Sequence, residues 1–162
     1  MSSPIRFGIL SCGRISADFV HAISQTPHAT VSHVAARSPA SAHEFLTTTG
    51  LSTNAVTVCD DYSALMASPC DIVYIGTLAQ HHFDLAMTCL KNNKPCLVEK
   101  PLSLSSAETS LLIETAREHD TFLFEGMWSR CFPATEYVRE TLAGGSIGTV
   151  VSVQGDFGWQ VS

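Results

Sequence analysis

The chain has 162 residues, of which 45% are hydrophobic and 15% are charged, and its formal net charge at pH 7 is −6. This composition fits a compact α/β domain and argues against disorder. An acidic chain without a basic stripe is not expected to bind nucleic acid. No apolar run reaches the about 18 residues of a membrane span, and MSSPIRFGIL lacks the pattern of a secretory signal. We therefore expect a cytoplasmic protein without membrane contact.

Six cysteines and seven histidines are scattered along the chain. The cysteines form no CxxC pair, and several lie in apolar runs, which is typical of buried reduced thiols. The histidines show no metal-ligand spacing, because the adjacent His81 and His82 would point to different sides of a helix. We expect no metal site.

Short apolar runs alternate with helical patterns from the N-terminus onward. Strands are predicted at 5–10, 30–36 and 55–59, and helices at 14–25, 40–49 and 60–68. Pro39 suits the first turn of the second helix, and Asp60 or Asp61 suits the cap of the third.

The same alternation continues to the end of the chain. Further strands are predicted at 71–77, 94–100, 121–126 and 149–159, and helices at 81–93, 105–119 and 133–143, with Ser105 or Ser106 as a cap. Strand and helix alternate six times before the final strand, which predicts a Rossmann-type, doubly wound parallel sheet. In such a sheet, ligands bind at the carboxyl ends of the strands, so the loops after the strands are the candidate sites.

The loop after the first predicted strand reads SCGRIS, from Ser11 to Ser16. A dinucleotide fingerprint has glycine, glycine and then glycine or alanine at the first, third and sixth places. Only Gly13 matches, with the small residues Ser11 and Ser16 at the other two places. The loop is therefore either a weakened site where a pyrophosphate approaches a helix N-terminus or a tight turn.

The second predicted strand ends in VAARS, with Arg37 and Ser38 where NAD-selective sites place an acidic residue. An arginine and a hydroxyl suit a 2′-phosphate, which favours NADP. The alternative is a solvated surface arginine.

Two later strand ends carry polar side chains. Thr77 ends one strand, and His82 begins a helix from which its ring would face a ligand, whereas His81 is expected to cap or pack. Glu99 and Lys100 suit proton transfer or contact with a nicotinamide ribose. The alternative for this pair is an ordinary salt bridge. The bond from Lys100 to Pro101 is a candidate for the cis form.

After the strand at 121–126, Trp128 and Arg130 follow in EGMWSRCFP. An aromatic face beside a cation suits a flat cofactor ring or an anionic substrate. The alternative is a core tryptophan with an arginine at its rim.

Taken in order, GILSCGRIS, VAARS, VEKP and EGMWSRCFP resemble the Gfo/Idh/MocA oxidoreductases, and within them the branch of dihydrodiol dehydrogenases and NADP-dependent xylose dehydrogenases. The resemblance implies a Rossmann domain over residues 1–143. It implies pyrophosphate contacts from Ser11, Cys12, Gly13, Arg14 and Ile15, and 2′-phosphate contacts from Arg37 and Ser38. It further implies a nicotinamide side lined by Thr77 and His82, a catalytic Lys100 with Glu99 beside it, and a pocket shaped by Trp128 and Arg130.

The chain departs from the family pattern at two places. Leu78 and Ala79 stand where the family often has Pro and Asn. Family members also continue into a second domain, an antiparallel sheet that carries most of the substrate pocket. We expect residues 144–162 to be a linker and the first strand of that domain, otherwise absent. This strand would pair with the same strand of a second copy in a homodimer, because an edge strand is a template for pairing, or fold back on the Rossmann domain.

Three classes of function stay open. The first is hydride transfer between NADP, or NAD, and a sugar, diol or small carbonyl substrate, with Lys100 as the key residue. The second is a non-redox cyclase, isomerase or lyase that works without a cofactor through Glu99, Lys100 and His82. The third is a non-catalytic nucleotide-binding module or subunit.

Overall fold

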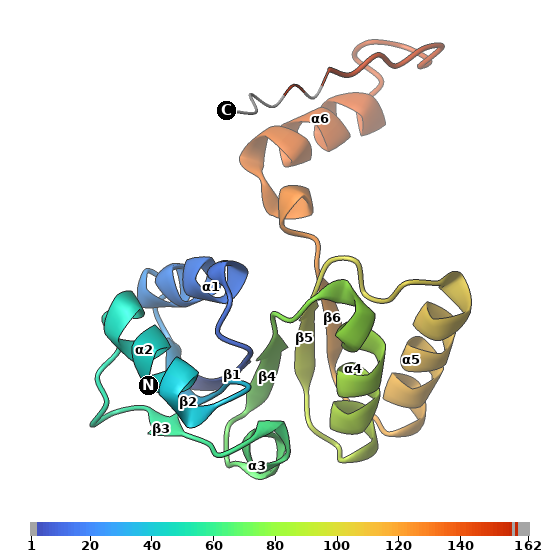
Figure 1. Cartoon of the computed structure of the whole chain (residues 1–162). Helices are drawn as coiled ribbons and strands as arrows, with labels where there is room; N and C mark the ends of the chain where they lie inside the picture. Colours follow the sequence, from blue (N-terminus) through green and yellow to red (C-terminus); the bar gives the residue numbers. More distant parts are fainter. Residues whose placement is uncertain (1–2, 157, 159–162) are drawn as a thin grey trace. The chain divides into compact units, whose positions relative to one another are not determined.

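A computed structural model of the chain describes residues 3–156 and 158. The chain divides into two compact units, Met1–Gly126 and Met127–Ser162. Among the described residues, the first unit contains every strand and the helices α1 to α5, and the second contains α6 (Figure 1). The expected domain boundary near residue 143 stays a prediction.

The first unit is built on a six-stranded sheet in the order β3-β2-β1-β4-β5-β6. Its strands are β1 (Ile5–Leu10), β2 (Ala29–Ala35), β3 (Thr57–Val58), β4 (Ile72–Ile75), β5 (Cys96–Glu99) and β6 (Leu123–Gly126). All neighbouring strands are parallel, so their carboxyl ends meet at one edge of the sheet. The strand order reverses between β1 and β4, where ligands of such sheets bind. The predicted Rossmann-type fold is confirmed.

Five helices and one 3-10 turn connect the strands. They are α1 (Arg14–Ser24), α2 (Pro39–Thr49), α3 (Tyr62–Ala67), the turn η1 (Ala79–His81), α4 (His82–Lys91) and α5 (Ser106–Glu118). The side chains of Ser38, Asp61 and Ser105 accept backbone N–H groups at the starts of α2, α3 and α5. Of the two pairs of candidate caps, Asp61 and Ser105 are therefore the residues that cap these helices. Gly13, at the start of α1, provides no such acceptor.

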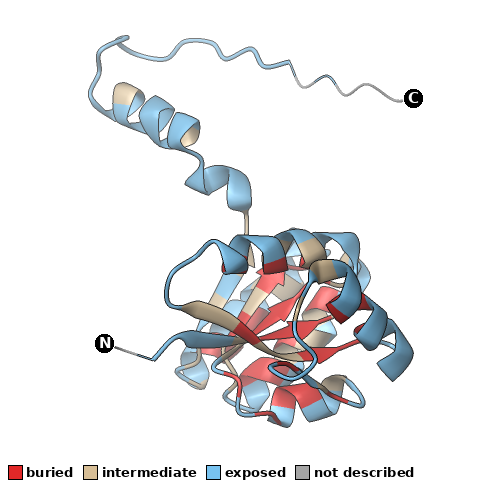
Figure 2. Ribbon diagram, turned by 90° about the vertical axis from the view of Figure 1, so that its left-hand side faces the viewer, coloured by how far each residue is buried: buried red, intermediate tan, exposed pale blue. Residues whose placement is uncertain are grey.

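The helices cover both faces of the sheet, with α1 and α2 on one face and α4 and α5 on the other (Figure 1). Because side chains alternate along a strand, Ile9 packs toward α1 and α2 while Leu10 packs toward α3, α4 and α5. Figure 2 shows the buried residues along the strands and on the inner sides of these helices. Burial of each large apolar side chain contributes about 1.5–3 kcal/mol, which is why the two cores form.

The cysteines are free thiols. Cys59, Cys70, Cys89 and Cys96 are buried, as their apolar surroundings in the sequence predict, whereas Cys12 is half-buried and Cys131 is exposed. Among residues 3–156 and 158, no three metal-ligating side chains of the His, Cys, Asp or Glu type gather. In the same residues, no helix combines the length and apolar character needed to cross a membrane.

The second unit contains the 3-10 turn η2 (Trp128–Cys131) and α6 (Pro133–Ala143). The strand predicted at 149–159 is wrong in its described part, since residues 149–156 and 158 have no strand structure. A strand needs a neighbour for its backbone hydrogen bonds, and the described part of this unit offers none. Val151 and Val153 are therefore 93% and 85% exposed rather than buried. Phe157 and Trp159 lie outside the described residues.

A close contact joins α1 to the end of β4. Ser16, in the first turn of α1, is fully buried, and its hydroxyl has no hydrogen-bond partner among the described residues. A Cβ atom at Gly76, just after β4, would collide with Ser16 Oγ and lie 2.8 Å from Cε1 of Tyr74. The helix can approach the sheet here only because residue 76 has no side chain.

This contact predicts opposite effects for two substitutions. Gly76→Ala should lower the free energy of unfolding by about 1–3 kcal/mol, because it overpacks the contact. Ser16→Ala should raise it by about 1 kcal/mol, because it removes a buried hydroxyl that has no partner. Urea-induced unfolding measures both, with Gly155→Ala as the control, since a Cβ at Gly155 meets nothing within 4 Å. Equal effects of the two glycine substitutions would contradict the close contact.

Candidate cofactor site

Two adjoining cavities of about 410 and 420 Å³ lie at the carboxyl ends of β1, β2 and β4. One extends along α2 and the other toward η1. They share Ser11, Gly13, Arg37 and Tyr62 in their linings, so we treat them as one cleft. The cleft lies entirely within the first unit, at the switch in strand order that the fold predicts as a ligand site.

The loop between β1 and α1 forms the middle of the cleft. Ser11 has a φ of 83°, the left-handed region that favours glycine, at the first glycine place of the fingerprint. Gly13 leaves room, because a Cβ there would have Gly76 O as its nearest neighbour at 3.9 Å. Since Gly13 caps α1 without a side-chain acceptor, the N–H groups of the first turn are open to an anion. The loop therefore fits a pyrophosphate.

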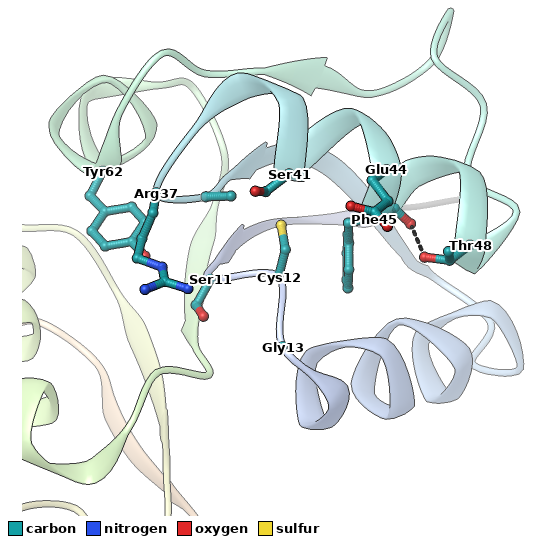
Figure 3. A pocket seen from close by; sticks show the side chains of 10 residues that line it. Ser11, Cys12, Gly13, Arg37, Ser41, Glu44, Phe45, Thr48 and Tyr62 are labelled. Atoms are coloured by element: carbon teal, nitrogen blue, oxygen red, sulfur yellow. Dashed lines mark hydrogen bonds between the residues drawn. The ribbon is translucent and has the colours of Figure 1, made fainter.

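Arg37, Ser41 and Tyr62 all line the cavity along α2 (Figure 3). Ser38 serves the backbone instead: its Oγ accepts the Ser41 N–H at 3.2 Å and lies 2.9 Å from Ser41 Oγ. Ser41 rather than Ser38 therefore places a hydroxyl in this cavity beside α2, and the sequence interpretation missed it. Its position one turn into a helix that begins beside Arg37 was the available signal.

Tyr62 is a second residue that the sequence interpretation missed. Figure 3 shows its ring beside Arg37 and near Ser11. Burial raises the pKa of the Tyr62 hydroxyl, while the positive charge of Arg37 opposes the rise. The phenol therefore stays protonated near neutral pH and can donate a hydrogen bond into the cleft.

Cys12 lines the same cavity without being reactive. Burial raises the pKa of its thiol to about 11, so the thiolate that a nucleophile or metal ligand requires is scarce at neutral pH. Its Sγ lies 3.9 Å from the carbonyl oxygen of Ala35. Cys12 therefore contributes shape rather than chemistry.

The sequence predicts that His82 faces the ligand and that His81 caps or packs, but the structure shows the reverse. His81 lines the cleft beside Thr77, whereas His82 is 1% exposed, with Nδ1 2.7 Å from Pro101 O and Nε2 3.1 Å from Thr77 O. The reason is that η1 ends at His81 and α4 begins at His82 with that residue turned toward the core. The Thr77 hydroxyl is buried without a partner in the described residues, which fits a polar ligand in the cleft.

Glu99 and Lys100 end β5 at the same edge of the sheet. The Tyr74 hydroxyl donates to Glu99 Oε1 at 2.9 Å, and the Lys100 backbone N–H donates to Glu99 Oε2 at 3.2 Å. Burial and the Glu99 charge raise the pKa of Tyr74 above its usual range. The Lys100 side chain is exposed, and the peptide bond between Lys100 and Pro101 is cis.

Trp128 and Arg130 belong to η2 in the second unit. The Trp128 ring packs edge-on against Phe132, with ring centroids 5.5 Å apart. Their expected place in the substrate pocket stays a prediction.

Comparisons with known proteins agree with this geometry. Residues 5–127 match the family model described as "Oxidoreductase family, NAD-binding Rossmann fold". The chain is 37% identical over 160 residues to trans-1,2-dihydrobenzene-1,2-diol dehydrogenase of Xenopus tropicalis and 34% identical over 157 residues to the human enzyme of that name. The chain therefore belongs to the Gfo/Idh/MocA oxidoreductase family, as its sequence predicts.

These alignments cover 96% and 95% of this chain but 47% and 46% of the two relatives. The chain thus spans about half the length of the curated relatives it matches. Among solved structures, it is similar to the 3-ketoreductase KijD10 from Actinomadura kijaniata in complex with NADP, with a TM-score of 0.79 and 28% identity. That similarity covers 90% of this chain and 46% of KijD10.

The backbone of Ser11 gives a prediction for stability. Ser11→Gly should raise the free energy of unfolding by about 1 kcal/mol, because relief of a strained positive φ exceeds the entropy that glycine adds to the unfolded chain. Chemical denaturation measures the change. Ser105→Gly is the control, because Ser105 has an unstrained φ of −145°. Its replacement should lower the free energy of unfolding by only about 0.3 kcal/mol. A Ser11→Gly variant with a lower free energy of unfolding than the unmodified chain would show that the Ser11 backbone is not strained.

Proposed function

We propose that the chain binds NADP in the cleft and forms the nucleotide-binding part of an enzyme that transfers a hydride to or from a diol, sugar or small carbonyl substrate. The observation that carries this proposal is the combination of an uncapped α1 N-terminus with Arg37 at the switch point of the sheet. The substrate class follows from the relatives, which are named as dehydrogenases of a dihydrodiol.

The choice of NADP over NAD rests on the cavity along α2. Arg37 and the Ser41 hydroxyl supply a cation and a donor for a 2′-phosphate, and no acidic residue follows directly after β2. Glu44, the carboxylate in this cavity, lies at the opposite end from Arg37 in Figure 3. KijD10, which is similar in fold, was solved with NADP.

Different residues of the cleft would bind the cofactor and orient the substrate. When bound, NADP supplies the site that accepts or donates the hydride. The first-turn N–H groups of α1 would hold the pyrophosphate, Arg37 and Ser41 would hold the 2′-phosphate, and the buried Thr77 hydroxyl would gain a hydrogen-bond partner from the bound cofactor. The Lys100 ammonium would hold a proton beside the substrate oxygen.

The non-redox alternative has less support. It requires Glu99 and His82 as free acid and base groups. Both Glu99 oxygens accept hydrogen bonds, from the Tyr74 hydroxyl and the Lys100 N–H, and both His82 ring nitrogens contact backbone carbonyls. These two side chains are therefore committed to the protein itself.

The surroundings of the enzyme are also part of the proposal. Trp128 and Arg130 would contribute to the substrate pocket. Pairing of residues 149–159 with the same segment of a second copy would give a homodimer, because an extended edge is a template for pairing. The four buried free thiols fit a reducing compartment such as the cytoplasm.

Cofactor selectivity tests the role of Arg37. Arg37→Ala should weaken NADPH binding by about tenfold or more, through loss of a charge-assisted contact, and leave NADH binding nearly unchanged. Calorimetric titration measures both nucleotides. Arg139→Ala is the control, because Arg139 is an exposed arginine paired with Glu136 on α6. If Arg37→Ala weakens NADPH and NADH equally, the 2′-phosphate assignment is wrong.

Turnover tests the role of Lys100. In the presence of aldose, diketone and other carbonyl substrates, the decrease in NADPH absorbance should slow by about a hundredfold or more in Lys100→Ala, since a positioned proton donor is lost. Lys91→Ala, at the exposed end of α4, should behave like the unmodified chain. Full turnover by the Lys100→Ala variant would show that Lys100 takes no part in catalysis.

A further inference from the structure

Three consecutive backbone groups after β5 are held by side chains. The Lys100 N–H donates to Glu99, the Pro101 carbonyl contacts His82, and the Leu102 N–H donates to Glu125 Oε1 at 2.9 Å. These side chains come from the end of β5, the start of α4 and the end of β6. We call Glu99, His82 and Glu125 the strand-end clamp.

The clamp is anchored in the core on the side of α1. Tyr74, which is fully buried, donates its hydroxyl to Glu99 and stacks on Phe19 of α1, with ring centroids 3.9 Å apart and planes 5° apart. A ring enclosed in this way has little freedom, so Glu99 Oε1 is fixed in place. Glu99 in turn fixes the amide of Lys100.

The other side of the clamp depends on Glu125. Leu102 is 8% exposed, so its N–H would be buried without a partner if the Glu125 carboxylate were removed. Pairing of Val98 with Glu125 and of Glu99 with Gly126 places β6 directly beside β5. Glu125 therefore reaches the loop from a strand that cannot move independently of the strand preceding Lys100.

A lysine side chain has four flexible methylene groups, and a catalytic ammonium must be held in a defined position. The Lys100 side chain is exposed and forms no hydrogen bond with the side chains or backbone of the described residues. Its position is thus set mainly by its backbone. The clamp fixes that backbone on both sides, at the Lys100 N–H and at the Leu102 N–H.

We propose that Glu125 is a positioning residue for Lys100, which it places at the nicotinamide end of the cleft by holding the Leu102 N–H. The role of the placed ammonium rests on the proposed function, whereas the clamp itself does not. Glu125 touches neither cofactor nor substrate in this assignment. It affects Lys100 only indirectly, through the backbone that connects Leu102 to Lys100.

The first experiment measures the clamp without nucleotide. Hydrogen exchange of the Leu102 amide should accelerate by about tenfold or more in Glu125→Ala, through loss of a hydrogen bond to a charged acceptor. Glu125→Gln keeps an acceptor oxygen and should restore slow exchange. Glu125→Asp is a second variant, which retains the charge but shortens the side chain, should the alanine variant fold poorly. Unchanged exchange of the Leu102 amide in both Glu125→Ala and Glu125→Asp would overturn the proposal.

The second experiment reads the position of Lys100 directly. The chain has three lysines, Lys91, Lys94 and Lys100, so acylation by an amine-specific reagent can be followed at each by mass spectrometry. NADPH should slow the labelling of Lys100 and leave that of Lys91 unchanged. In Glu125→Ala this protection should be largely lost at saturating NADPH, and in Glu125→Gln it should be retained.

Glu108→Ala is the matched control. Glu108 Oε2 accepts the Leu104 N–H at 3.1 Å, the same kind of bond two residues further along the loop. Protection of Lys100 should survive this substitution. Equal loss of protection in Glu108→Ala and Glu125→Ala would show general loosening of the loop and overturn the specific role of Glu125.

The two proposals fail in different ways. If calorimetry finds no NADPH binding by the unmodified chain, the proposed function is wrong. In that case the Leu102 exchange rate and the labelling of Lys100 without nucleotide still test whether Glu125 holds this loop. If NADPH binds and protects Lys100 equally in the unmodified chain and in Glu125→Ala, Glu125 has no positioning role.

Discussion

The first turn of α1 lies against the end of β4, and the candidate site depends on this contact. Gly76 gives Ser16 the room to approach. The approach directs the N-terminus of α1 into the cleft at the switch between β1 and β4. Further along the same helix, Phe19 stacks on Tyr74, which holds Glu99. One helix is therefore connected both to the proposed pyrophosphate site and to the backbone of Lys100.

The strands and helices of the first unit follow closely from the sequence. The second half of IRFGIL and most of IVYI are buried on both faces of a parallel sheet, and the helices between the strands carry apolar stripes that cover those faces. The strand predicted at 149–159 has the right alternation, but alternation describes only the side chains. A strand also needs a partner for its backbone, which a sequence pattern does not supply.

The site was predictable where it depends on chain order and not where it depends on packing. Loop residues such as Gly13 and Arg37 lie at strand ends, so their place in the cleft follows from the fold. Ser41 and Tyr62 reach it through the way α2 and α3 pack. For His81 and His82, the start of α4 decides which ring enters the cleft, because one residue along a helix rotates a side chain by about 100°.

We propose that the loop at residues 11–16, together with Arg37, Ser41 and Tyr62, binds NADP. Chemical-shift mapping of the backbone amides during a titration with NADP tests it most directly, because the method locates the ligand without requiring turnover. We predict that the largest shifts fall on these residues and on Gly76 and Thr77. Shifts confined to other parts of the sheet, or no shifts at saturating nucleotide, would show that NADP does not bind in the cleft.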